Sequence, residues 1–211
     1  MNYLEILQEI NRLAGTQGTV DAVSGLAGYQ ELLPSYADNA YEDIQLFRDC
    51  DWIFMRQEAE KALDATTNSF TDTDIAKIRF ITYDYKKLTY VPYERWILWE
   101  NMSTGEPKMY TIQPETGEVT LNPLNAAYTV KVYYQRVPDT MTAQTDEPIL
   151  PTRFQNLIVF KALIDLGQYV GNYDLIQHYG TRFSVLMGQM LRSQNPAKKL
   201  KTKPFVRGEF Y

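Results

Sequence analysis

The chain has 211 residues, a net charge of -5, and a composition that is 45% apolar, 13% aromatic and 22% charged. These proportions are typical of one globular domain, or of one domain with a small subdomain. No apolar run reaches about 18 residues, which predicts that no segment spans a membrane. With one cysteine, Cys50, and one histidine, His178, the chain can build neither an intrachain disulfide nor a zinc site of the usual Cys/His type.

The charge is concentrated unevenly along the chain. Residues 198–211 carry a net charge of +4, so the remaining residues carry -9 of the total of -5. An acidic body with a basic, aromatic-tipped tail indicates a tail that binds a partner. A solvated, disordered terminus is the alternative interpretation of the same composition.

The spacing of apolar residues predicts a helix close to the N-terminus. They recur at three-residue steps, at Leu4, Leu7, Ile10 and Leu13. Asn2 and Glu5 form the pattern of a capping box, and Gly15 ends the helix.

A second helix is predicted to begin at Ser35 as its N-cap, after Pro34, and to end at Arg48. Its apolar face is expected to consist of Ala37, Ala40, Tyr41, Ile44 and Phe47. The run 52–54 then reads as a short strand. Residues 58–70 are interpreted as a connection.

Between residues 77 and 137 the apolar pattern changes to the period of two that is typical of strands. Ile78, Phe80 and Thr82 are expected on one side of a first strand, and residues 95–99 form a second. Residues 109–112 and 119–121 flank a turn with Gly117 and predict a hairpin, and a last strand follows over 128–137. Together they predict a small antiparallel sheet of four or five strands.

Helices return after an extended, proline-containing loop. Thr152 and Gln155 have the spacing of a capping box for the first of them. The last helix has the clearest apolar stripe in the chain, and Pro196 stops it. The stripe consists of Leu175, Tyr179, Phe183, Leu186 and Met190.

This order of elements predicts an α+β fold, mainly a helical bundle with an inserted small antiparallel β subdomain and an extended C-terminal arm. The expected parts are bundle helices over 1–57, the β subdomain over 58–137, further bundle helices over 138–195, and the arm over 196–211. The candidate bundle core comprises Leu7, Ile10, Tyr41, Ile44, Phe47, Leu157, Ile158, Leu175, Tyr179, Phe183, Leu186 and Met190.

Residue types that carry chemistry are scarce. His178 has Asp174 one helical turn before it, but no recognisable nucleophile motif accompanies the pair. Residues 72–74 contain two acids and are expected to cap a short helix rather than to bind a metal. We therefore expect no catalytic residue, no metal and no cofactor, and the chain is not expected to be an enzyme.

Three segments resemble tailed-bacteriophage head-to-tail adaptor proteins. YEDIQLFRDCDWIFM (41–55) is similar to a helix of that family that runs into an aromatic D-W-x-F. Residues 105–134 resemble its G-x-P-x-x-Y hairpin before a last strand, and residues 130–163 its acidic D-E-P-x-L-P linker and following helix. The order and spacing of the segments carry the resemblance. The family often has a histidine in the stretch where this chain has Phe154-Gln155-Asn156.

The resemblance implies a structural protein of the virion neck, assembled in the host cytoplasm. It implies a ring of about twelve copies beneath the portal protein, joined to tail or nozzle proteins and enclosing part of the DNA channel. Genomic DNA would pass through without sequence-specific binding, and an acidic wall suits such a channel because it repels phosphate.

The resemblance also implies that the C-terminal arm docks on the portal. Its candidate docking residues are Lys198, Lys199, Lys201, Lys203, Phe205, Val206, Arg207, Phe210 and Tyr211. Another neck component, such as a tail terminator or completion protein, is an alternative. A β-rich carbohydrate-binding module is a less favoured alternative, with an aromatic surface formed by Tyr83, Tyr85, Tyr90, Tyr93, Trp96 and Trp99.

Overall fold

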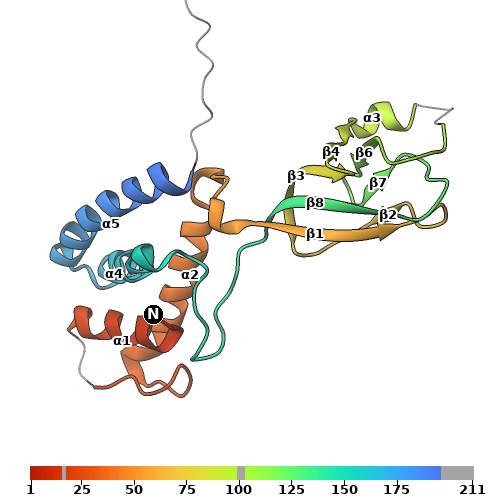
Figure 1. Ribbon diagram of the computed structural model, residues 1–211. Coiled ribbons are helices and arrows are strands. Elements are labelled where there is room, and N and C mark those ends of the chain that lie inside the picture. Colours follow the sequence, from red (N-terminus) through yellow and green to blue (C-terminus); the bar gives the residue numbers. More distant parts are fainter. Residues whose placement is uncertain (16–17, 99–102, 196–211) are drawn as a thin grey trace, which may run out of the picture. The chain divides into compact units, whose positions relative to one another are not determined.

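The chain divides into two compact units in the computed structural model (Figure 1), which describes residues 1–15, 18–98 and 103–195. The helical unit combines residues 1–44 with the chain from Met141 onward. The β unit consists of Gln45–Thr140, so it is inserted between the two halves of the helical unit. This division places residues 45–57 with the strands. The structure contains both helices and sheets, which confirms the predicted α+β class.

The helical unit is built from short and long helices of both chain halves. The first half supplies α1 (Tyr3–Ala14), the 3-10 helix Gly28–Leu32 and α2 (Leu33–Gln45), whose last residue belongs to the β unit. The second half supplies the 3-10 helix Thr152–Phe154, α4 (Asn156–Val170) and α5 (Tyr173–Gln194). Helix α4 packs against both α1 and α5, which makes it the centre of the unit (Figure 1).

Helix α1 begins and ends where the sequence predicts. The Asn2 side chain accepts a hydrogen bond from the Glu5 amide, and the Glu5 carboxylate accepts one from the Asn2 amide. These two bonds satisfy amide groups that have no partner inside the helix. Gly15 ends the helix in a left-handed conformation, φ 71°, which glycine adopts without a steric penalty.

The predicted starts of α2 and α4 are wrong. Ser35 lies inside the first turn of α2, where its hydroxyl donates to the Leu32 carbonyl 2.8 Å away instead of capping the helix. Thr152 opens a separate 3-10 turn, and α4 follows from Asn156 without a side-chain cap. In both places a short 3-10 helix precedes the α-helix and supplies hydrogen-bond acceptors for the backbone amides of its first turn. A local capping pattern therefore marks the wrong residue as the start of the helix.

Direct hydrogen bonds join the two chain halves within the helical unit. The Tyr3 amide donates to the Asp146 carbonyl at 2.8 Å, and the amino terminus donates to Gln155 Oε1 at 2.6 Å. The hydroxyl of Tyr41, a side chain that is 1% exposed, accepts from the Ile149 amide at 2.9 Å. The loop before α4 is therefore fixed to α1 and α2 through its backbone.

The β unit contains two four-stranded sheets, where one antiparallel sheet was predicted. Their strand orders are β1-β8-β3-β4 and β2-β7-β6-β5, and β5 pairs with β6 in parallel. One buried cluster takes side chains from both sheets, among them Ile81, Leu121 and Val132. The strands are β1 (Arg56–Leu63), β2 (Ser69–Phe70), β3 (Ile75–Tyr83), β4 (Lys86–Lys87), β5 (Thr89–Tyr90), β6 (Met109–Ile112), β7 (Val119–Leu121) and β8 (Tyr128–Arg136).

Two strand patterns are confirmed and one is wrong. The β6–β7 hairpin forms. The alternating pattern of β8 predicts Tyr128, Val130, Val132 and Tyr134 on one side of the strand, and there the last three are buried and Tyr128 is half-buried. In β3 the register against β8 shifts twice, between Ile75 and Lys77 and between Ile78 and Phe80. These bulges break the period of two. Phe80 therefore leaves the face of Ile78 and stacks on Tyr133, with ring centroids 4.5 Å apart.

Three local predictions within the β unit are also wrong. Residues Ile53–Met55 form a 3-10 turn rather than a strand. Strand β1 begins directly after it and extends to Leu63, into the segment 58–70 that was interpreted as a connection. The indole of Trp52 is fully buried and donates to the Gln45 carbonyl, so this aromatic run anchors a turn. Tyr93–Trp96 form one helical turn, α3, where a strand was expected.

The candidate core residues differ in burial. The buried ones are Leu7, Ile10, Tyr41, Ile44, Leu157, Ile158, Tyr179 and Met190. Those only half-buried are Phe47, Leu175, Phe183 and Leu186. Phe47 lies beyond the end of α2, in the 3-10 turn Phe47–Asp49 of the β unit. The other three lie on α5, which packs mainly against α4.

The packing of the two chain halves against each other can be tested at Tyr41 and Ile44. Tyr41→Phe removes the acceptor of the Ile149 amide, and we expect it to lower the free energy of unfolding by about 1–3 kcal/mol. Ile44→Asp buries a charge and is expected to unfold the helical unit. Urea unfolding followed by circular dichroism measures both, with the exposed Glu42→Gln as the control. An unchanged transition for Ile44→Asp would show that this face of α2 is wrongly assigned.

Candidate functional site

A band of tyrosine and charged side chains crosses the surface of the helical unit between α2 and α4. We call it the tyrosine strip. It consists of Tyr29, Tyr36, Asp43, Lys161, Asp165 and Tyr169. At one end the rings of Tyr36 and Tyr169 lie 6.4 Å apart. At the other end Lys161 Nζ lies 2.9 Å from Asp43 and 2.6 Å from Asp165.

Helical spacing explains why these residues form one strip. Lys161, Asp165 and Tyr169 are four residues apart and therefore lie on one face of α4. Tyr36 and Asp43 are seven residues apart on α2, two turns of the helix. The two contacts pair early residues of one helix with late residues of the other, so α2 and α4 run in opposite directions along the strip.

The electrostatics of the strip follow from an excess of carboxylate. Burial alone would lower the pKa of Lys161, but the carboxylates of Asp165 and Asp43 raise it, so this lysine stays charged. Two carboxylates share this one ammonium group. Partial burial raises the pKa of the Tyr36 phenol, and the nearby Tyr169 and Asp165 raise it further. The strip thus presents neutral phenols beside negative charge.

The corner between α4 and α5 extends the apolar character of this surface. Tyr169, Val170 and Tyr173 are 68%, 46% and 82% exposed. Two glycines allow the tight turn. Gly171 adopts the left-handed φ of 72°, and Gly167 leaves room for the start of α5, because a side chain there would come within 3.1–3.2 Å of Asn172, Leu175 and Ile176. The two glycines therefore place three large side chains in solvent at the end of the tyrosine strip.

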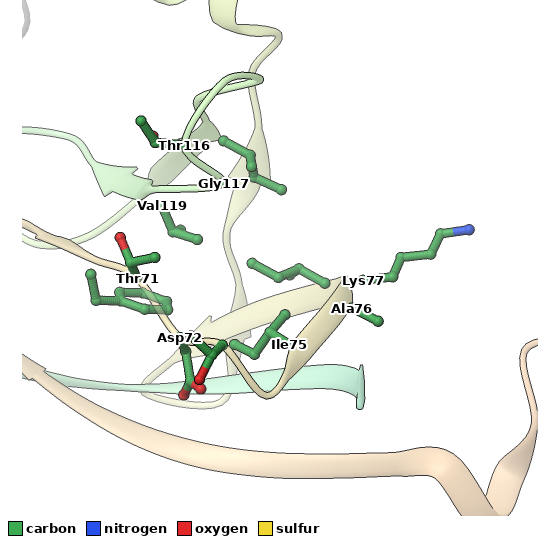
Figure 2. A pocket seen from close by; sticks show the side chains of 12 residues that line it. Thr71, Asp72, Ile75, Ala76, Lys77, Thr116, Gly117 and Val119 are labelled. Atoms are coloured by element: carbon green, nitrogen blue, oxygen red, sulfur yellow. The ribbon is translucent and has the colours of Figure 1, made fainter. Parts of the chain in front are cut away.

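The β unit contains a pocket of about 530 Å³ (Figure 2). It is lined by the connection between β2 and β3, by β3, and by the β6–β7 hairpin. Ile75 of β3 and Val119 of β7 project toward the hollow from different strands, whereas the Lys77 side chain extends away from it. The lining is mainly apolar, and its charged residues are Asp72 and Lys77.

Asp72, at the rim of this pocket, has a structural role. Its carboxylate pairs with Lys61 of β1 at 2.7 Å and accepts the Asp74 amide at 3.0 Å. The Lys61 hydrogen bond, with that amide, holds the pKa of Asp72 below its usual range. The prediction that residues 72–74 cap a helix is wrong, because a turn leads directly into β3.

The aromatic residues of the carbohydrate-binding alternative lie in several elements of the β unit. Tyr83 packs edge-to-face on Tyr128 with centroids 5.4 Å apart. Tyr85 stands fully exposed at the turn between β3 and β4, with φ 61°. Tyr90 is 50% exposed on β5, and Tyr93 and Trp96 are half-buried in α3. Trp99 lies outside the described residues.

Other candidates of the sequence can now be located. His178 is exposed on α5, with its ring edge-on to Tyr179 at 4.9 Å. Within residues 1–15, 18–98 and 103–195, the side chains of His, Cys, Asp and Glu form no group that could hold a metal ion. No helix in the same ranges is long and apolar enough to cross a membrane. The candidate docking residues of the arm, Lys198 to Tyr211, lie outside the described residues.

The tyrosine strip was missed by reasoning from the sequence. Its residues come from the 3-10 helix Gly28–Leu32 and α2 on one side, and from α4, which lies more than 100 positions later in the chain. The spacing of Lys161, Asp165 and Tyr169 was the available signal, because three polar or amphipathic residues at four-residue steps mark one exposed face of a helix. Their partners on α2 depend on tertiary packing.

Comparison with known proteins matches the chain to a protein family. The family model described as SU10 adaptor protein matches residues 1–200, which is nearly the whole chain. None of the curated proteins compared with the chain matches it.

The ion pair at the pocket rim predicts a pH dependence of stability. Because folding lowers the pKa of Asp72, the ionised carboxylate stabilises the folded state fully at pH values above its unfolded pKa of about 3.9. This stabilisation is lost as the pH falls through the folded pKa. At neutral pH we expect Asp72→Asn to lower the free energy of unfolding by about 0.5–1 kcal/mol.

Urea unfolding across the acid range measures this difference. Asp74→Asn is the matched control, because Asp74 is exposed in the same turn. The free energies of unfolding of the two variants should differ at pH 7, and at low pH both should approach that of the wild type. A difference that does not change with pH would contradict the role of the Asp72 charge.

Proposed function

Because this chain belongs to the SU10 adaptor protein family, a family of phage head-to-tail adaptors, we propose that it forms a ring beneath the portal and links the capsid to the tail. The family indicates a structural role in the virion neck. The observation that carries the proposal is the match over residues 1–200, which includes both the helical unit and the β unit.

A ring of about twelve copies requires each copy to present two different surfaces that close on each other. The helical unit supports such contacts. Exposed large apolar side chains of its described residues include Tyr169, Val170, Tyr173 and Val185. Tyrosine is enriched at protein–protein contacts because it combines a large ring with a hydroxyl group. We assign ring formation to this unit.

The β unit is proposed to contact the tail or nozzle proteins. Tyr85 at its β3–β4 turn is fully exposed, and Ile97 and Leu98 after α3 are 61% and 76% exposed. A hollow of about 460 Å³ beside them is lined by residues that include Tyr90, Arg95 and Leu98. Aromatic and aliphatic anchors entering such hollows typically supply most of the energy of a protein contact.

The charge distribution supports a DNA channel through the ring. Within residues 1–44 the acidic side chains are Glu5, Glu9, Asp21, Glu31, Asp38, Glu42 and Asp43, against the single basic Arg12. An acidic wall does not retain phosphate, whereas a basic wall binds DNA by releasing its counterions. Since salt screens charge over about 8 Å, this repulsion acts only where such residues line the lumen. DNA would then pass without sequence-specific binding.

The C-terminal arm is proposed to dock on the portal protein. Its net charge of +4 suits an acidic surface, and Phe205, Val206, Phe210 and Tyr211 supply apolar anchors. Ordering a segment on binding costs entropy. Repetition of the arm around a ring offsets that cost, because each bound arm raises the effective concentration of the next.

Truncation tests the portal contact. A chain lacking residues 197–211 should fold with an unchanged melting temperature and bind portal-containing heads at least about tenfold more weakly. Sedimentation of the chain with purified heads measures the binding. The matched control keeps the aromatic residues and replaces the five basic residues of the arm by glutamine, which separates charge from apolar anchoring. Normal attachment of the truncated chain would refute the role of the arm.

A further inference from the structure

We propose that, in the ring, the tyrosine strip of one copy receives the outward face of helix α5 of the neighbouring copy. The inference rests on the proposed ring and names the two surfaces that close it. The occupant of the strip is thus a second copy of this chain.

The outward face of α5 is a continuous exposed stripe. We call it the α5 face. It consists of Asp174, His178, Arg182, Val185, Gln189 and Arg192, at steps of three and four residues, and all six are exposed. These steps keep the side chains on one side of a helix. Helix α5 has 22 residues, so the stripe is about 30 Å long.

Val185 is the apolar centre of the α5 face. It is 59% exposed, and Arg182 and Arg192 lie one turn before it and two turns after it. Both arginines are exposed. The Arg182 guanidinium lies 5.9 Å from the centre of the Tyr179 ring, which orients it along the helix. An exposed apolar side chain between two cations is suited to a surface that offers aromatic rings beside carboxylates.

The tyrosine strip offers that combination. Tyr169 is exposed, and Asp43 and Asp165 place two carboxylates against the single Lys161. The Asp43 side chain is 59% exposed, so it can bind a second cation while it keeps its contact with Lys161. Arginine binds carboxylates through two parallel hydrogen bonds and also stacks on tyrosine rings, so it can use both parts of the strip.

The two surfaces also satisfy the geometry of a closed ring. The tyrosine strip lies on the 3-10 helix Gly28–Leu32, α2 and α4, whereas the α5 face lies on the exposed side of α5. Each copy therefore carries one of each surface. A contact between unlike surfaces leaves a strip free on one end of a pair and an α5 face free on the other. Such a contact propagates from copy to copy until the ring closes, whereas a contact between identical surfaces stops at a dimer.

Cysteine cross-linking tests the contact directly. The chain has a single cysteine, Cys50, which is buried, so an introduced thiol is the accessible one. A chain with Tyr169→Cys and a second with Val185→Cys are mixed and assembled on portal-containing heads. Under mild oxidation we expect a cross-linked dimer in the mixture and none in either variant alone. The control pair joins Val185→Cys to Thr145→Cys, an exposed position on the loop before α4.

Charge exchange gives a second readout that does not depend on thiols. Arg182→Glu places like charges together, and we expect it to lower the yield of rings roughly tenfold without changing the melting temperature. Asp43→Lys in the same chain should restore the yield, because each contact again joins opposite charges. Arg153→Glu is the matched control, since Arg153 is exposed in the helical unit and belongs to neither surface.

The outcomes separate this inference from the proposed function. Rings that assemble on the portal while the Tyr169 and Val185 thiols stay unlinked, or link no better than the control pair, would overturn the assigned contact and leave the adaptor ring intact. Absence of rings from the wild-type chain on heads would overturn both.

Discussion

One constraint governs the architecture: the helical core closes only when two chain segments that the β unit separates come together. The Tyr41 hydroxyl, the Tyr3 amide and the amino terminus each bond to the loop or turn before α4. The β unit makes this closure possible because its first and last strands, β1 and β8, pair antiparallel along their whole length, from Arg56 opposite Gln135 to Leu63 opposite Tyr128. The chain therefore leaves the inserted unit beside the point where it entered.

The same constraint explains which features the sequence could predict. Patterns that depend on neighbouring residues were reliable, such as the α1 capping box, the β6–β7 hairpin and the alternation in β8. The starts of α2 and α4 could not be found, because 3-10 turns before them satisfy the groups that a cap would serve. Which residues of β3 share a face depends on its bulges against β8. The second sheet depends on pairing between short strands such as β2 and β7. The tyrosine strip needs the closed core, so no local pattern contains it.

The described surfaces are suited to assembly. Two of the charged groups with shifted pKa values are held in structural ion pairs, Asp72 with Lys61 and Lys161 with two carboxylates. Exposed apolar side chains lie at the corner of α4 and α5, on α5 itself, and at several places of the β unit, among them the β3–β4 turn and the residues after α3. In a head-to-tail adaptor, a helical unit that contacts its copies and a β unit that contacts the tail would divide these tasks between two separately folded cores.

If this chain is an architectural link between the capsid vertex and the tail, it must form part of the virion neck. A reconstruction of the neck, with the chain located by its two units, is the decisive measurement. We expect a closed ring of this chain against the portal, with α5 of each copy facing α2 and α4 of the next. Mature particles that lack the chain, or that carry it elsewhere than the neck, would show that it is not this link.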